Sequence, residues 1–252
     1  MESQIILDCE SFDSSLESLE KIYSTSSNDI IEYLGSVDLE KIFKTNKPKD
    51  TYGYDYLFEC FERIFKTEIK EFEAYCFHTT RIPKGTTFTN GILPLNQIID
   101  EIEEFIDKIA FDLSLEIIKI DLTKDNMIDR KLRNDNSPWG IFIKDWAFEL
   151  PSGIHNYLKF PEIVEDIINF KYPDDCSVLL KEYSQRTVRC IVKFKVPSLI
   201  KRERLPRLIY YIYHKVNKLE MECDCAFNYS NQGFKIDQGN IEKVEYLSNK
   251  LN

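Results

Sequence analysis

The sequence is poor in glycine and histidine, and this scarcity argues against several catalytic classes. Its 252 residues include 8 glycines and 3 histidines. The glycines form none of the strings G-x-S-x-G, G-x-x-x-x-G-K-[ST] and G-x-G-x-x-G. Those strings build the nucleophile elbow of α/β-hydrolases, the phosphate-binding P-loop and the dinucleotide fingerprint. The sequence therefore indicates none of these three kinds of site.

Long apolar runs and a cysteine framework are also missing. No stretch approaches the roughly 18 apolar residues that span a membrane, and the first residues, MESQIILDCESFDSS, lack the cationic and apolar regions of a signal peptide. The seven cysteines are irregularly spaced, which is typical of reduced thiols. We therefore expect a cytoplasmic protein without membrane contact. The 43% of hydrophobic residues is enough for a sizeable core.

Charge is unevenly distributed along the chain, whose formal net charge is −10. Residues 1–72 hold 8 basic and 16 acidic side chains, whereas residues 185–218 hold 10 basic side chains and a single acidic one, Glu203. Either the acidic segment docks on the basic segment within the chain, or the basic segment is free to meet an anion. We favour docking within the chain, because it needs no partner.

Short helices are predicted at the start of the chain. From Ser14, leucine and isoleucine recur at helical spacing behind serine caps, and Asp29 and Asp38 can cap two further helices. Residues 54–66 carry a wide apolar stripe, which favours a helix packed against a core. We predict that residues 1–71 form an acidic helical N-terminal region.

The rest of the chain alternates between strand and helix patterns. Strands are predicted where the sequence reads FEAYCFHTTRI, GIFIKDWAF, VRCIVKFKV, MECDCAFNYS and IEKVEYL. Helices are predicted where it reads NQIIDEIEEFIDKIAFDL, TKDNMIDRKLR, PEIVEDIINF and RLIYYIYHKVNKL. The predicted fold class is α+β, with a helical N-terminal region followed by a mixed, mainly antiparallel sheet and flanking helices. Residues 72–252 are expected to form this α+β domain.

His78 has the most suggestive surroundings of the three histidines. Strand side chains alternate between two faces, so the imidazole of His78 and the hydroxyl of Thr80 project together. Such a pair can hold a ligand hydroxyl. Arg81 and the loop that begins at Gly91 place a cation and backbone amides near the strand end, where a phosphate could bind. The alternative is a structural histidine whose ring hydrogen-bonds a backbone carbonyl.

Other binding chemistries find less support in the sequence. Phosphoesterases with two H-x-T or H-x-S motifs need a second motif, and this chain lacks one. Cys223 and Cys225 share a strand face without a C-x-x-C pair, so we interpret them as buried thiols and expect no metal site. The basic segment 201–218 could bind nucleic acid through interleaved tyrosines. We do not favour this, because those tyrosines suit a helix face in a core and the chain is acidic overall.

A strand that ends in His-x-Thr, followed by a loop with the element GILPL that opens a helix, resembles the first motif of ADP-ribosyltransferase-like domains of the His-Tyr-Glu type. The resemblance covers roughly residues 72–250 and rests on FHTTR and GILPL. It implies that NAD is the substrate and that His78 holds the nicotinamide ribose. It also implies that Tyr157 packs on the nicotinamide and that Glu222 binds the ribose 2′-hydroxyl and supports an oxocarbenium-like transition state.

The same resemblance assigns the neighbours of His78. Thr80 takes the hydroxyl position after the histidine and Arg81 meets the pyrophosphate, while Thr79 stands where the family commonly has glycine. Tyr157 and Glu222 are matched by their order along the chain.

Two functions follow from these patterns. The first is an NAD-dependent ADP-ribosyltransferase, of the kind found in bacterial toxins and anti-phage defence effectors, which transfers ADP-ribose to a macromolecule or hydrolyses NAD. The second is a non-enzymatic interaction module, like an immunity protein or antitoxin, in which His78 is structural and the acidic helical region is the binding face. In both cases the acceptor or protein partner is unidentified.

Overall fold

The computed structural model describes residues 5–46, 52–116, 128–129 and 137–248. The chain divides into two compact units, each built from three segments. Unit 1 comprises Met1–Phe77, Ile141–Ile154 and Lys195–Tyr229, and unit 2 comprises His78–Gly140, His155–Phe194 and Ser230–Asn252. Whether residues 1–71 and 72–252 behave as separate domains stays a prediction.

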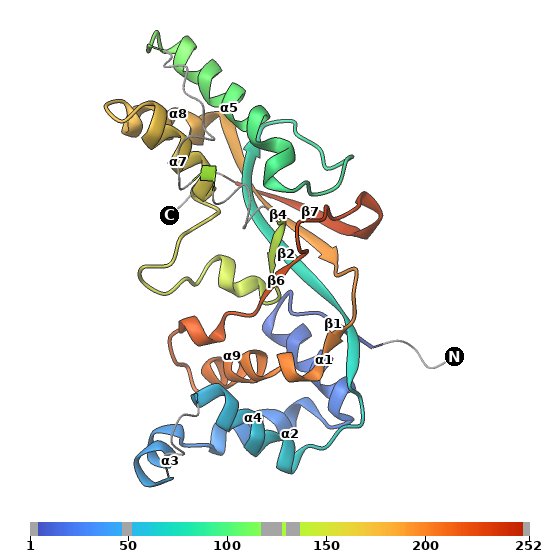
Figure 1. Ribbon diagram of the computed structural model, residues 1–252. Helices are drawn as coiled ribbons and strands as arrows, with labels where there is room; N and C mark the ends of the chain where they lie inside the picture. The colour runs from blue at the N-terminus through green and yellow to red at the C-terminus, as the bar shows by residue number, and fades with distance from the viewer. Residues whose placement is uncertain (1–4, 47–51, 117–127, 130–136, 249–252) are drawn as a thin grey trace. The chain divides into compact units, whose positions relative to one another are not determined.

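Unit 1 contains the N-terminal helices and one helix from the last third of the chain. Its helices are α1 (Phe12–Tyr23), α2 (Ser27–Ser36), α3 (Leu39–Asn46), α4 (Gly53–Ile64) and α9 (Pro206–Val216), with short 3-10 turns η2 (Lys144–Ala147), η3 (Arg202–Arg204) and η4 (Cys223–Cys225). Helix α9 packs against α1, α2 and α4, and the four lie together in Figure 1. The predicted N-terminal helical region is therefore confirmed.

The local sequence explains where these helices begin. Ser11 caps α1, because its hydroxyl accepts from the amide of Ser14 while the Ser14 hydroxyl accepts from the amide of Ser11. Pro206 opens α9, where its missing amide costs nothing. The face of α9 toward the core is apolar and aromatic, and each fully buried leucine or isoleucine contributes about 1.5–3 kcal/mol. Its buried apolar residues include Leu208, Ile209, Tyr211, Ile212 and Tyr213.

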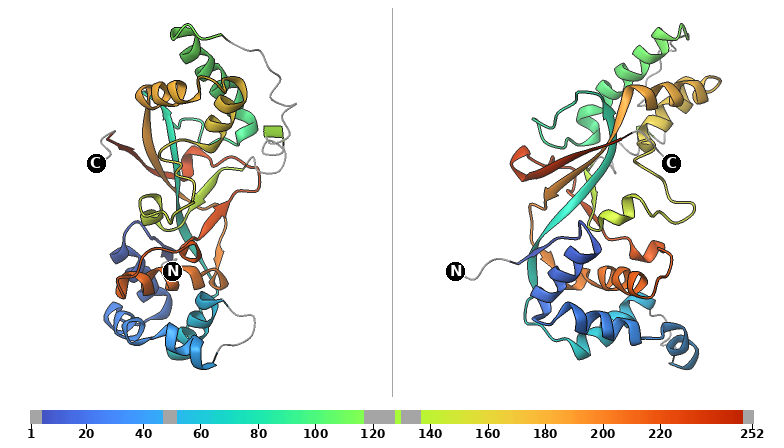
Figure 2. Two further views of the ribbon diagram at one scale, coloured as in Figure 1. Left: turned by 90° about the vertical axis from the view of Figure 1, so that its left-hand side faces the viewer. Right: turned by 180° about the vertical axis from the view of Figure 1, so that it is seen from behind.

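Unit 2 contains a second helical group. Its helices are α5 (Leu95–Asp112), α7 (Glu162–Lys171) and α8 (Cys176–Arg186), with the turn η5 (Gln238–Asn240). The three helices contact one another, and Figure 2 shows them side by side from two further directions. Their apolar faces form one core of mainly isoleucine side chains, to which two tyrosines contribute. The predicted helices at NQIIDEIEEFIDKIAFDL and PEIVEDIINF are confirmed as α5 and α7.

The described strands form a seven-stranded sheet, so the α+β prediction is confirmed. The strands are β1 (Ile6–Leu7), β2 (Glu71–Pro83), β3 (Trp139–Ile141), β4 (Thr187–Lys195), β5 (Ile200–Lys201), β6 (Asn228–Ser230) and β7 (Ile241–Leu247). The main path runs β6-β3-β2-β4-β7, and β1 and β5 pair with β2. Strand β1 pairs parallel with β2, whereas β3 and β5 pair antiparallel with β2, and β7 pairs antiparallel with β4.

Two predicted strands are longer in the sequence pattern than in the structure. The segment GIFIKDWAF is a strand only to Ile141 and then turns into η2. In the segment MECDCAFNYS only β6 is a strand, because the Arg207 side chain lies within 3.2–3.4 Å of the carbonyl oxygens of Cys223, Asp224 and Ala226. Carbonyls that turn toward one guanidinium do not face a neighbouring strand.

Two further helical segments were either not predicted or lie mostly outside the described residues. Helix α8 was not predicted, and its weak pattern explains why, since only Leu179 and Tyr183 are buried in it. The helix predicted at TKDNMIDRKLR lies outside the described residues, apart from Ile128 and Asp129, which are helical. No helix of the described chain is both long and apolar enough to cross a membrane.

Candidate functional site

His78 lies on β2, in the part of the strand that belongs to unit 2. Its Nδ1 is 2.7 Å from the carbonyl oxygen of Trp139. A carbonyl oxygen only accepts, so Nδ1 donates and Nε2 carries the lone pair. Burial lowers the pKa of His78 below its usual value, and the hydrogen bond to Trp139 opposes this to a smaller extent. The ring is therefore neutral near pH 7, and among the described residues no hydrogen bond reaches Nε2.

The carbonyl contact of His78 is the arrangement expected of a structural histidine. The same geometry also fixes the tautomer that a ligand-holding histidine needs, because Nε2 is left as an acceptor. Thr80 follows two residues later on β2, so the alternation of the strand places both side chains on one face. Both side chains are partly exposed.

Arg81 is buried, with 7% of its surface exposed. Its Nε donates to the hydroxyl of Thr187 over 2.7 Å, and its Nη1 to the carbonyl oxygen of Leu158 over 3.3 Å. A further bond joins Nη2 to the carbonyl oxygen of Ser184. Burial lowers the pKa of this guanidinium. Arg81 thus holds the start of β4 and the 158 loop together, and its contact with a pyrophosphate stays a prediction.

Gly91 lies where two loops of unit 2 approach closely. Its φ of +82° is in the left-handed region, and a Cβ there would lie 2.0 Å from the carbonyl oxygen of Ile236. The next residue, Ile92, exchanges two backbone hydrogen bonds of 2.9 Å with Ile236. Glycine is therefore required at position 91 for backbone packing. A role of its amide in binding phosphate stays a prediction.

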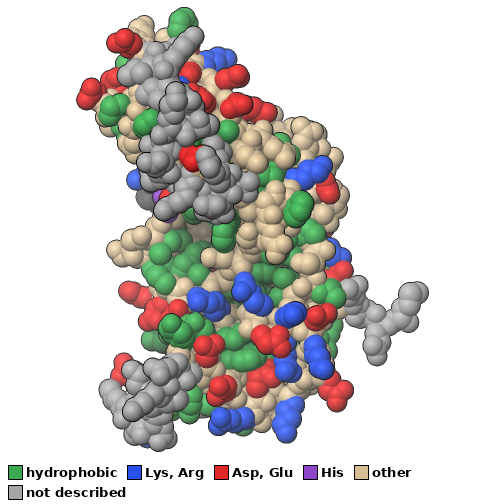
Figure 3. All heavy atoms as spheres, in the orientation of Figure 1, with side chains coloured by type: hydrophobic (Ala, Val, Ile, Leu, Met, Phe, Trp, Pro, Cys, Tyr) green, Lys and Arg blue, Asp and Glu red, His purple; other side chains and the backbone are tan. Residues whose placement is uncertain are grey.

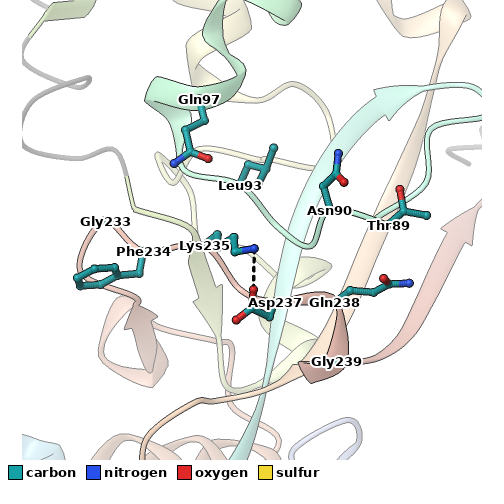
Figure 4. Close-up of a pocket in the computed structure, with 10 residues that line it drawn as sticks. All are labelled: Thr89, Asn90, Leu93, Gln97, Gly233, Phe234, Lys235, Asp237, Gln238 and Gly239. Carbon is teal, nitrogen blue, oxygen red and sulfur yellow. Dashed lines mark ion pairs between the residues drawn. The ribbon is translucent and has the colours of Figure 1, made fainter.

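These two loops line a polar groove of about 810 Å³. One side comes from residues 89–97 and the other from residues 233–239 (Figure 4). The ring of Phe234 lies at one end of the row of side chains in Figure 4, and Gln238 and Thr89 lie at the other. Sequence reasoning missed this groove. The signals are the Asn90-Gly91 pair and the glycines at 233 and 239, but nothing in the sequence shows that these turns meet.

Tyr157 and Glu222 lie in different units. Tyr157 belongs to unit 2, is 45% exposed, and donates from its hydroxyl to Glu162 over 3.3 Å. Its ring meets the ring of His155 edge-on, with centroids 4.7 Å apart. Glu222 belongs to unit 1, is exposed and accepts a 2.9 Å hydrogen bond from the hydroxyl of Tyr210. That Tyr157 and Glu222 join His78 at one site stays a prediction.

The basic segment is largely engaged within unit 1. Arg202 forms an ion pair with Glu62 at 3.5 Å, and Lys195 forms one with Glu73 at 2.7 Å. The Arg202–Glu62 pair therefore joins part of the basic segment to residues 1–72, as we favoured, whereas Glu73 lies just beyond them. Lys215 pairs with carboxylates of the 141–154 segment. In the lower part of Figure 3, basic and acidic side chains are interspersed rather than separated by sign.

The tyrosines of the basic segment mostly face the core. Tyr211 is fully buried and Tyr213 is 7% exposed, so neither offers a face to a nucleic-acid base. Tyr210 is partly exposed, but its hydroxyl is bound to Glu222. Nucleic-acid binding by residues 201–218 stays a prediction that we do not favour.

Neither metal ligands nor known relatives identify the site. Within the described ranges, no three histidine, cysteine or carboxylate side chains gather as a metal site would require. No protein-family model, curated protein or solved structure matches this chain. The geometry of His78 and its surroundings is therefore the basis for a functional proposal.

Proposed function

We propose that the protein is an NAD-dependent ADP-ribosyltransferase-like enzyme in which His78 holds a hydroxyl group of the NAD ribose. The observation that carries this proposal is the hydrogen bonding and protonation of the His78 imidazole. Its Nδ1 is committed to the Trp139 carbonyl oxygen at 2.7 Å, and its Nε2 is an acceptor in a neutral ring. A ribose hydroxyl can donate to that nitrogen. Thr80, on the same face of β2, supplies a second hydroxyl.

In the proposed reaction the bond between the nicotinamide nitrogen and ribose C1′ breaks, and nicotinamide leaves with the bonding electrons. The acceptor nucleophile, or water, then bonds to C1′ and loses its proton. Positive charge develops on the ribose, and a carboxylate nearby stabilises it more in the transition state than in the ground state. The parts of Tyr157 and Glu222 in this step rest on the resemblance.

A second candidate is an interaction module without catalysis. Arg81 favours it, because three of its nitrogens bind acceptors within unit 2. The bond from His78 to Trp139 is then only a link between β2 and β3. In this case the exposed surface of the acidic N-terminal helices would meet a protein partner, in the manner of an immunity protein or antitoxin.

Thermal unfolding of the purified chain with NAD, ADP-ribose or nicotinamide separates the two functions. A ligand that binds only the folded state raises the free energy of unfolding by about 2.7 kcal/mol at a hundredfold excess over Kd. We expect NAD to raise the melting temperature of the wild type, and His78→Ala to reduce this rise relative to its own ligand-free state.

The matched control is His155→Ala. His155 also lies in unit 2 and has a ring nitrogen, Nε2, at 2.7 Å from a backbone carbonyl oxygen, that of Phe160. This variant should keep the shift with NAD. No shift of the wild type at millimolar NAD, or an undiminished shift in His78→Ala, would overturn the enzyme proposal and leave the interaction module.

A further inference from the structure

The groove beside Gly91 contains a feature that the proposed reaction does not use. The side chain of Phe234 is 71% exposed, although it lies on a turn at the rim of this groove. We propose that the groove binds the adenine base of an uncharged nucleoside, with the base stacked on Phe234. This inference does not rest on the proposed function, because His78 does not line the groove.

The turn that carries Phe234 is held in place by hydrogen bonds. The side-chain amide of Asn231 donates to the carbonyl oxygens of Phe234 and Lys235, both over 2.9 Å. The amide of Gly233 donates to the hydroxyl of Ser137 over 3.1 Å. An aromatic ring on a preorganised turn loses little further freedom when a ligand stacks on it, which favours binding.

The opposite side of the groove is also fixed. Gly91 permits the close approach of the two loops, and the two hydrogen bonds between Ile92 and Ile236 lock their register. Gln97 lies on the first turn of α5 and lines the groove. In Figure 4 its amide points down toward the segment of residues 233–239. Hydrogen bonds within the chain therefore hold both sides of the groove.

The lining chemistry matches a base rather than a phosphate. Among the described residues that line the groove, the charged side chains are Lys235 and Asp237, and they pair with each other at 2.8 Å, so this lining is neutral. The other polar side chains are carboxamides and a hydroxyl, from Gln97, Asn90, Gln238 and Thr89. A carboxamide offers a donor beside an acceptor, which is the pattern that pairs with adenine. Aromatic rings stack on bases through either face.

The test is calorimetric titration of the full chain with adenosine, guanosine and AMP. We expect adenosine to bind about tenfold more tightly than guanosine, since one matched carboxamide contact separates the two bases. AMP should bind no more tightly than adenosine, because the one cation among the described lining residues, Lys235, is paired with Asp237. Binding of AMP without binding of adenosine would overturn the proposal, since it would show that phosphate drives recognition.

Phe234→Ala is the decisive variant and Phe111→Ala is its control. Both side chains are 71% exposed, but Phe111 lies on α5 outside the groove. Phe234→Ala should weaken adenosine binding about tenfold or more, as loss of a stacked ring does. Phe111→Ala should leave adenosine affinity within about twofold. Equal losses in the two variants, or no binding by the wild type at about 5 mM adenosine, would overturn the proposal.

The outcome is distinguishable from that of the NAD experiment. His78→Ala should leave adenosine binding unchanged, while it abolishes the NAD shift measured in the presence of excess adenosine, which occupies the groove. Loss of adenosine binding in His78→Ala, with the variant still folded, would show that the groove is not an independent site and would overturn the inference.

Discussion

The two units differ in the polar side chains that they bury. Among the described residues, unit 1 buries two serines and a histidine, whereas unit 2 buries mainly lysine and arginine side chains. The buried polar residues of unit 1 are Ser15, Ser18 and His214. Those of unit 2 are Arg81, Lys171, Thr187, Arg189 and Lys193. A buried charge must be met by acceptors inside the fold, whereas a surface charge keeps its water. Among the described residues, unit 2 therefore depends more on individual polar contacts.

The hydrogen-bond networks of the two units show this contrast directly. In unit 2 the Lys171 side chain is 1% exposed, and its Nζ lies 2.7 Å from both Glu103 and Asp107. The carboxylates keep 25% and 27% of their side-chain surface exposed. In the comparable network of unit 1 the buried group is the phenol of Tyr211, which donates to Asp145 over 2.8 Å. The cation beside it, Lys215, is 23% exposed.

The largest expected effect comes from Asp107→Ala in unit 2. The change removes two of the contacts of the Lys171 ammonium and the acceptor of the Tyr172 hydroxyl. Breaking a buried pair on one side costs about 3–5 kcal/mol, and we expect about 3 kcal/mol because Glu103 remains. Urea unfolding measures the loss as a lower midpoint at unchanged slope.

Two variants sharpen this prediction. Asp112→Ala, on the same helix, removes a more exposed ion pair with Arg186 and should cost less than about 1 kcal/mol. Lys171→Met removes the buried charge itself, so it should cost far less than Asp107→Ala. If Asp112→Ala were as damaging as Asp107→Ala, burial of Lys171 would not be the cause.

The second-largest loss of stability is expected at Arg81, a buried cation of unit 2. Its described hydrogen bonds go to uncharged acceptors. Arg81→Met should cost about 2 kcal/mol, since the carbonyl oxygens of Leu158 and Ser184 lose a donor inside the fold. Arg81→Lys should recover part of this loss, because one ammonium can reach only some of the acceptors. Denaturant unfolding of the two variants checks the order, and equal stability of Arg81→Met and the wild type would contradict it.

The matching change in unit 1 should be smaller. Tyr211→Phe removes one hydrogen bond to Asp145, but that carboxylate keeps Lys215 at 2.9 Å and is partly exposed. The expected loss is about 1 kcal/mol, measured by urea unfolding. A loss as large as that of Asp107→Ala would remove the contrast between the units.

The sequence predicted the elements whose side chains repeat regularly. Helices α5, α7 and α9 and strands β4 and β7 follow apolar periodicity, which is local. The strand predicted around η4 was wrong because the conformation there depends on Arg207, which lies 16 to 19 residues earlier in the chain. A window of neighbouring residues does not contain that information.

The candidate site also depends on contacts between residues that are far apart in the sequence. The sequence placed His78 and Thr80 on one strand face, but the atom that sets the tautomer belongs to Trp139, 61 residues away. The charge count treated residues 185–218 as one basic segment, yet the structure divides it. Arg186, Arg189 and Lys193 belong to unit 2, and the rest of its cations belong to unit 1. Net charge along a chain does not show which charges will be buried.

The smallest expected effect is the pH dependence that His78 contributes. Its pKa is lowered in the folded state, so the unfolded chain binds the proton more tightly and falling pH favours unfolding. The contribution of the neutral ring is fully present above the usual pKa of 6.5 and is lost as pH falls through the lowered folded value. His78→Gln can still donate to the Trp139 carbonyl oxygen but does not titrate. The free energy of unfolding of the wild type should therefore fall more steeply between about pH 7 and 5 than that of the variant, and parallel curves would show that the ring is not desolvated.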